Sequence, residues 1–314
     1  MRILAIMMAF TLSAMSARAW GPDGHMVVAA AAWKKLTPEV QKEAARLLQM
    51  NPSYDSWISG ISAAERDEIA FIMAATWPDE IKGNRNYKND GEHPPAGPQS
   101  SQNIGYSDML QHRYWHFYDT PFSPDSTPLG KPDPVNALTQ IQLFTAAIKT
   151  TTDDSIKSYD LVWLIHIVGD VHQPLHATTR FDAQDPKGDE GGNRIIICSV
   201  PPASADSKCS SELHGFWDDV PGVNRGPESA RTQTATLPAP GATATDADPT
   251  HWIDESFLAA KESAYANPPI GVGDGPFVLT PAYRSKASSV VQARLALAAA
   301  RLADLLNQNL VSSH

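Results

Sequence analysis

The pattern of apolar and polar positions along this 314-residue chain predicts helices almost throughout. An amphipathic pattern indicates a helix over about residues 135–149, and a mostly apolar pattern indicates a second helix over about 155–172. Pro174 ends the second helix, because proline cannot continue the helical hydrogen-bond ladder. Residues 193–198 are the one stretch that predicts a strand, since they are β-branched and follow two glycines.

Helix-start residues predict further helices. Thr37 followed by Pro38 is typical of a cap and first turn, and that helix should end before Asn51-Pro52. Ser62 to Glu65 has the pattern of a capping box for a helix that reaches Ala75. Helices are also expected at 27–33, 252–265 and 281–309, the last capped by Thr280, with irregular polar loops at 83–105, 121–134 and 220–249. The pattern as a whole predicts an all-α fold, a mainly helical single domain with long loops and at most a small β-hairpin.

The first 19 residues have the pattern of an export signal. Arg2 precedes an apolar run from Ile3 to Leu12, and small residues end at Ala19. The apolar run is too short to span a membrane. We therefore expect cleavage after Ala19, a mature domain of residues 20–314 that begins at Trp20, and a periplasmic or secreted location.

Charge and cysteine content narrow the function classes. The formal net charge is −10, and loss of Arg2 and Arg18 with the signal would make it near −12. That charge argues against a protein that holds nucleic acid on a basic surface, but bound zinc can reverse the local sign at a site for phosphates. Cys198 and Cys209 are expected to form a disulfide in an exported protein, worth about 2–3 kcal/mol.

Two pairs of residues indicate a metal site. His166 and Asp170 lie four residues apart, hence on one helix face, and His176 follows just beyond the proline. His214 and Asp218 repeat the same spacing. Imidazole and carboxylate groups are the donors that a divalent metal of zinc type prefers. With other residues at helix–loop junctions, the candidate metal ligands are Trp20, His25, Asp79, His116, His166, Asp170, His176, His214 and Asp218.

In this order the candidates resemble the S1/P1 class of trinuclear zinc-dependent single-strand nucleases and 3′-nucleotidases, to which zinc phospholipase C is distantly related. The matching pieces are Trp20 with His25, Trp77-Pro78-Asp79, His116-Phe117-x-Asp119, His166-x3-Asp170-x5-His176, Gly191-Gly192-Asn193 and His214-x3-Asp218. The resemblance extends from the first mature residue to about residue 218 and implies the zinc phospholipase C/nuclease-like fold.

The resemblance also implies three zinc ions per chain in a fixed division of ligands. One zinc would be held by Asp79, His116, His166 and Asp170. A second, close to the first, would be held by His25, the shared Asp170, and the free α-amine and carbonyl of Trp20. The third would be held by His176, His214 and Asp218. Because an amide nitrogen cannot take the place of a free α-amine, removal of the signal would complete the site.

The expected chemistry follows from general properties of zinc. Water that bridges the close pair would lose a proton near neutral pH, attack phosphorus in line and release O3′, which leaves 5′-phosphate products. By resemblance, Asp119 would orient the attacking water and Phe117 would stack on a base. Many relatives carry Arg three residues after the aspartate that matches Asp79, but Lys82 stands here. Lysine can neutralise a phosphate oxygen, although only as a point charge.

Each candidate also has a purely structural interpretation. Asp79 could cap a helix after Pro78, Asp119 could be a turn residue, and Phe117 could be a core aromatic. Trp20 and His25 could be ordinary packing at the N-terminus, and His214 and Asp218 could be a pair on a surface helix. His172 lies two residues past Asp170 on the other side of the helix, which favours a supporting role. It is the series of ligand-type residues in order that favours a metal centre.

The leading hypothesis is a zinc-dependent endonuclease that hydrolyses single-stranded DNA and RNA and also acts on 3′-mononucleotides. The expected molecule is a monomer with no membrane partner. One rival is a phospholipase C of the same metal architecture, but Asp218 stands where phospholipases carry Glu, and Phe117 belongs to the nuclease-type cluster. The other rival is a non-catalytic periplasmic zinc-binding protein, a class in which flexible His-rich runs are common.

Overall fold

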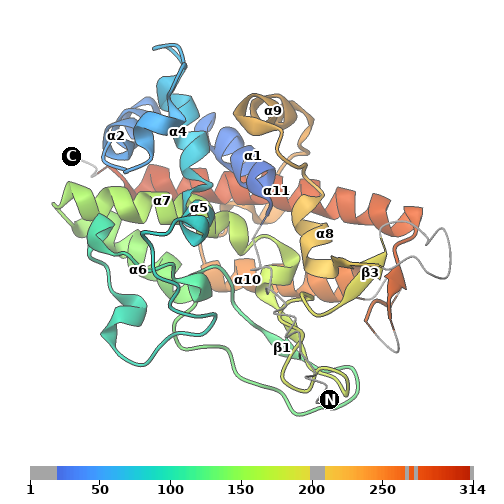
Figure 1. Ribbon diagram of the computed structural model, residues 1–314. Helices are drawn as coiled ribbons and strands as arrows, with labels where there is room; N and C mark the ends of the chain where they lie inside the picture. The colour runs from blue at the N-terminus through green and yellow to red at the C-terminus, as the bar shows by residue number, and fades with distance from the viewer. Residues whose placement is uncertain (1–19, 199–208, 266–268, 272–274, 312–314) are drawn as a thin grey trace, which may run out of the picture.

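The computed structural model describes residues 20–198, 209–265, 269–271 and 275–311, and within them the fold is mainly helical (Figure 1). The predicted export signal, residues 1–19, lies outside the described residues. The helices are α1 (Pro22–Trp33), α2 (Pro38–Leu48), α3 (Tyr54–Trp57), α4 (Arg66–Ala74), α5 (Trp77–Gly83), α6 (Ala137–Thr150), α7 (Asp154–Asp170), α8 (Leu213–Asp219), α9 (Gly226–Gln233), α10 (Pro249–Ala259) and α11 (Pro281–Asn309). The predicted all-α class is confirmed.

Helix α7 is the central element. It is buried from Ser158 to Asp170 on every face, as expected for a helix that is apolar all round. Helix α6 packs along it, and the long α11 runs across the molecule behind it (Figure 1). Helix α1 packs between α11, α9 and α4. The ligand-bearing C-terminal end of α7 is therefore surrounded by other elements.

Local capping explains where several helices begin. The Thr37 hydroxyl accepts a hydrogen bond from the Val40 N–H, and the Thr280 hydroxyl accepts one from the Tyr283 N–H, so both predicted caps are confirmed. The capping box expected at Ser62 is wrong. Helix α4 begins only at Arg66, because the Ser62 hydroxyl donates 2.7 Å to the Glu65 carboxylate and no side chain caps the backbone.

The strands form two small sheets. Strand β1 (Pro121–Phe122) pairs in parallel with β2 (Thr179–Arg180), and β3 (Ile196–Cys198) lies between β4 (Ser211–Glu212) and β5 (Phe277–Val278). The predicted strand at 193–198 is present but shorter. The prediction of at most a small β-hairpin underestimates the strand content, because β3 pairs antiparallel with β4 and also parallel with β5.

Two further sequence predictions can be compared with the structure. The disulfide between Cys198 and Cys209 is present, as expected. The loop predicted at 220–249 is not wholly irregular, because it contains α9, which packs on α1. That helix has few apolar residues, so its local pattern gave no signal. No helix in the described part of the chain combines the length and apolarity needed to cross a membrane.

Asp160, in the middle of α7, gives a testable pH dependence of stability. The side chain has no exposure, and one carboxyl oxygen accepts 3.0 Å from Asn103 while the other has no partner. Burial raises the pKa of Asp160 from 3.8 to about 8. Because the pKa of Asp160 is higher in the folded than in the unfolded state, the contribution of its neutral carboxyl to folding stability is fully present below about pH 4. This contribution is lost as the pH rises through about 8.

Replacement of Asp160 by asparagine should therefore stabilise the protein more at pH 8 than at pH 5, with a difference on the order of a few kcal/mol in the free energy of unfolding. Thermal melting of both proteins at the two pH values measures this difference. An equal shift in melting temperature at pH 5 and pH 8 would show that folding does not change the pKa of the Asp160 carboxyl.

Candidate metal centre

The last turn of α7 presents His166 and Asp170 to one buried space, as their spacing predicts. Both side chains have no exposure. His166 Nδ1 lies 2.6 Å from the carbonyl oxygen of Ala75, and a carbonyl can only accept, so the proton is on Nδ1. In the neutral ring His166 Nε2 therefore carries a lone pair, and it lies 3.3 Å from Asp170 Oδ2.

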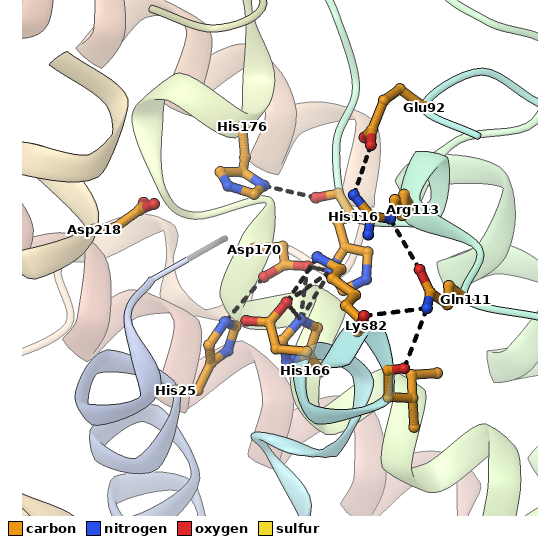
Figure 2. Close-up of polar contacts among 12 residues, drawn as sticks. His25, Lys82, Glu92, Gln111, Arg113, His116, His166, Asp170, His176 and Asp218 are labelled. Carbon is orange, nitrogen blue, oxygen red and sulfur yellow. Dashed lines mark hydrogen bonds and ion pairs between the residues drawn. The ribbon is translucent and has the colours of Figure 1, made fainter. Parts of the chain in front are cut away.

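Three other elements bring ligand-type side chains to the same space (Figure 2). Helix α1 supplies His25, whose Nε2 lies 3.2 Å from Asp170 Oδ1 and whose ring stacks on His166 at 3.9 Å between centroids. His116, which ends the short 3-10 helix η3 (Arg113–Trp115), places Nδ1 3.0 Å from Asp170 Oδ2 and 2.9 Å from His166 Nε2. Asp79 in α5 has Oδ1 3.9 Å from both of these nitrogens. The two oxygens of Asp170 thus face different histidines.

A second group lies beyond the end of α7. His176 is in the 3-10 helix η4 (Pro174–Ala177), and His214 and Asp218 are on one face of α8. His176 Nε2 and His214 Nε2 face each other at 3.0 Å, and Asp218 Oδ2 lies 3.5 Å from His214 Nε2. Gly191 supports this group. Its φ of +60° suits glycine, and its carbonyl accepts from His214 Nδ1 at 2.8 Å.

The second group has the donor arrangement of a metal site. His176 Nδ1 donates to the His116 carbonyl at 2.8 Å, and His214 Nδ1 donates to the Gly191 carbonyl. Both Nε2 atoms are therefore unprotonated in the neutral rings and point their lone pairs at each other. Two lone pairs 3.0 Å apart repel unless a cation lies between them. The residues present thus fit a bound cation.

The first group consists of His25, Asp79, His116, His166 and Asp170, and its unpartnered atoms support the same conclusion. Within the described residues, these buried atoms have no hydrogen-bond partner: both ring nitrogens of His25, His116 Nε2, Asp79 Oδ2 and Asp170 Oδ1. Buried polar atoms are normally satisfied. Three sets of ligand atoms each lie within 4.8 Å of one another, namely His25 with His166 and Asp170, Asp79 with His116 and His166, and His176 with His214 and Asp218. Nitrogen and oxygen donors in this mixture suit zinc.

The pKa values differ among the histidines of the first group. Burial lowers the pKa of His166, but the negative charges of Asp170 and Asp79 raise it above its ordinary value. Burial lowers the pKa of His25 to about 4 and that of His116 to about 3, so both rings are neutral and able to ligate near pH 7. Burial raises the pKa of Asp79, but Lys82 and the neighbouring histidines lower it further, so this carboxyl stays ionised. Burial raises the pKa of Asp218 strongly, so this carboxylate requires a nearby positive charge to stay ionised at neutral pH.

Trp20 is fixed between the two groups. The side chain has no exposure, and the indole Nε1 donates 2.9 Å to the carbonyl of Gly169, next to Asp170. The N–H of Gly21 donates 2.9 Å to the carbonyl of Asp218. The main chain of Trp20 therefore runs between the ends of α7 and α8, which carry candidate ligands of both groups.

The three residues expected to act on substrate lie in different surroundings. Lys82 places Nζ 2.7 Å from Asp79 Oδ1, at the edge of the first group. Phe117 packs partly exposed against the core beside His116. Asp119 is partly buried, and burial with the negative charges of Asp133 and Asp189 raises its pKa to about 7. The Asp119 carboxyl therefore lies near other acidic side chains.

Two glutamines around these groups were missed in the sequence. Gln111 Nε2 donates to the carbonyls of Ile81 and Lys82 in the last turn of α5, while Arg113 donates to Gln111 Oε1 at 3.0 Å (Figure 2). Gln111 Nε2 also lies 3.2 Å from the carbonyl oxygen of Tyr87, beyond α5. Gln173, also buried, donates to Asp218. The sequence gives no local signal for either glutamine, because each stands beside a histidine in a stretch of mixed polar and apolar residues.

His172 faces away from both groups. Its Nδ1 donates 2.7 Å to the Val168 carbonyl, and its Nε2 faces Arg301 at 3.0 Å. Burial and two arginines lower its pKa strongly, so the ring is neutral and accepts from Arg301. This contact is structural support on the α11 side of α7.

Fold and site together define a mainly helical protein with several buried His/Asp groups able to bind metal ions. A family model described as S1/P1 Nuclease matches residues 20–311, so the chain belongs to the S1/P1 nuclease family. This family consists of zinc-dependent nucleases, which makes the chain a hydrolytic nuclease that acts on nucleic acid. A direct comparison with curated proteins gives no match.

Proposed function

We propose that this nuclease is exported, acts as a monomer, and hydrolyses single-stranded DNA and RNA to 5′-phosphate products with three zinc ions bound per chain. We also propose that it removes the phosphate of 3′-mononucleotides. The single observation that carries the proposal is the 3.0 Å approach of His176 Nε2 to His214 Nε2, in two rings whose Nδ1 atoms both face carbonyls, next to a first group organised around Asp170. Zinc would supply Lewis acidity and lower the pKa of water to about 7.

The proposed ligand sets follow the two groups. Asp170 would serve two zinc ions, because one oxygen faces His25 and the other faces His116 and His166. Asp79 would complete the set around His116 and His166, and the α-amine and carbonyl of Trp20 would join His25. The third zinc would be held by His176, His214 and Asp218.

The remaining residues would act on substrate. Asp119 would orient the attacking water, and its pKa of about 7 lets it accept a proton near neutral pH. Phe117 would stack on an exposed base, a contact worth about 1–3 kcal/mol that tolerates any base. Bases in a duplex are already stacked, so this contact favours single strands.

The proposal is tested on purified protein whose chain begins at Trp20. Single-stranded DNA, RNA, duplex DNA, a 3′-mononucleotide and phosphatidylcholine are each incubated with it and zinc. We expect cleavage of both single strands, 5′-phosphate ends, release of phosphate from the mononucleotide, slow cleavage of duplex and intact lipid. Lipid hydrolysis without nuclease activity would favour the phospholipase, and zinc binding without any hydrolysis would favour the binding protein.

Lys82 is proposed to neutralise a phosphate oxygen in the transition state. Lys82→Met should lower kcat about 10²-fold, the scale for loss of one positioned electrostatic group, while Lys82→Arg should retain most activity because it restores the charge. Steady-state kinetics on a short single-stranded oligonucleotide measure both. Equal losses in the two variants would assign Lys82 to packing against Asp79 instead of phosphate binding.

A further inference from the structure

The turn that joins the two ligand groups contains a buried glutamine. Asp170 ends α7, His176 lies in η4, and Gln173 between them has no exposure. Gln173 Oε1 accepts from the Leu175 N–H at 2.5 Å, and Gln173 Nε2 donates to Asp218 Oδ1 at 2.7 Å. The side chain thus connects the turn to α8, which carries His214 and Asp218.

These two hydrogen bonds fix the orientation of the Gln173 amide. A backbone N–H can only donate, so the atom that faces Leu175 must be the amide oxygen, and the NH2 group must face Asp218. Asp218 Oδ1 is therefore occupied by a donor. The other oxygen, Oδ2, remains on the side of His214, 3.5 Å from its Nε2. The glutamine in this way assigns different partners to the two oxygens of one carboxylate.

The turn is also held from the opposite side. The Ser256 hydroxyl on α10 donates to the Val171 carbonyl at 2.5 Å, and Arg294 Nε on α11 donates to the His172 carbonyl at 3.2 Å. Ser256 and Arg294 are both buried. Because its carbonyls are fixed, the turn presents Gln173 to Asp218 at a set position relative to Asp170.

We propose that Gln173 is a positioning residue for the third metal group: it holds Asp218 so that Oδ2 faces His176 and His214. The inference rests on the proposed function, because it assigns a partner to one of the three proposed zinc ions. Hydrogen bonds to metal-ligating carboxylates orient the ligand, and their loss commonly lowers metal affinity about 10–100-fold. A charge-assisted bond in a buried site is among the stronger hydrogen bonds.

The decisive variant is Gln173→Glu, which keeps the shape and the acceptor for Leu175 but places a carboxylate against Asp218. We expect zinc affinity at the third group to fall about 10–100-fold, so that zinc content drops from three to two per chain at low free zinc and recovers at high zinc. Zinc content is measured by elemental analysis across a series of buffered zinc concentrations. Gln140→Glu is the matched control, a buried glutamine on α6 that should keep three zinc ions.

A kinetic readout separates positioning from a general loss of fold. His176, His214 and Asp218 would hold the zinc whose charge stabilises O3′ as it leaves, so Gln173→Glu should lower kcat on single-stranded DNA with little change in KM. The 4-nitrophenyl ester of thymidine 5′-phosphate places a nitrophenolate, a good leaving group that needs little stabilisation, where O3′ would be. Its cleavage should therefore fall much less than that of DNA.

The possible results separate a failure of the role of Gln173 from a failure of the proposed three-zinc nuclease. Three zinc ions at unchanged affinity in Gln173→Glu, or equal kinetic losses on the two substrates, would overturn the role of Gln173 while the three-zinc nuclease stands. Fewer than three zinc ions in the unmodified protein would overturn the proposed function itself. Should Gln173→Glu fail to fold, Gln173→Met removes the donor without adding charge, and unchanged zinc affinity in it would likewise overturn the inference.

Discussion

Replacement of Asp170 by asparagine is expected to remove both zinc ions that are proposed for the first group and to lower kcat/KM on single-stranded DNA by at least about 10³-fold. Bound metals contribute several kcal/mol to stabilisation of a phosphoryl-transfer transition state. Asp170 has no exposure and lies within 3.3 Å of ring nitrogens from three histidines, His25, His116 and His166. Asparagine supplies one neutral oxygen and turns an NH2 group toward one side of the site.

The control for this variant lies on the same helix. Asp160→Asn makes the identical chemical change at another buried position of α7, where the carboxyl contacts Asn103 and no candidate ligand. It should therefore retain three zinc ions and full activity. Elemental analysis and oligonucleotide kinetics on both variants give the comparison. Full zinc content and activity in Asp170→Asn would exclude Asp170 as the shared ligand.

Sequence patterns predicted the parts of the molecule that depend on local spacing. The four-residue intervals of His166 with Asp170 and of His214 with Asp218 each place two side chains on one helix face, and the structure shows both pairs converging. Caps such as Thr280 marked helix starts for the same reason, since a side-chain hydroxyl and a backbone N–H three residues later meet locally. These features need no knowledge of the rest of the chain.

Contacts between distant segments could not be read in this way. The hydrogen bond from Gln173 to Asp218 joins residues 45 positions apart, and the pairing of β3 with β5 joins segments even farther apart in the chain. Buried glutamine has no helical or strand signature, so only its three-dimensional partners reveal its role. Ser62 shows the reverse case, because the local motif predicts a capping box that does not form, and the Ser62 hydroxyl donates to the Glu65 carboxylate instead.

Trp20, the proposed N-terminus of the mature chain, is the second position where a small change should have a large effect. Addition of a single glycine before Trp20 is expected to remove about one zinc ion and to lower activity at least about 10²-fold. The added peptide bond converts the proposed α-amine ligand to an amide, which does not ligate zinc at neutral pH, and metal sites need deprotonated donors already in place. Zinc content, by elemental analysis, and oligonucleotide kinetics are measured on two chains, one that begins at Trp20 and one with a glycine added before it.

The contributions of the Trp20 indole and of the Trp20 α-amine can be measured separately with a matched variant. Trp20→Phe with a native free amine loses the bond from Nε1 to the Gly169 carbonyl and leaves a cavity in the core, so it should lose a few kcal/mol of stability and keep its zinc. Added glycine leaves the indole intact but blocks the amine. Zinc loss in the glycine variant alone therefore assigns the ligand to the amine and makes signal cleavage the step that completes the site. Full zinc and activity in that variant would instead leave Trp20 as a packing residue beside Asp170.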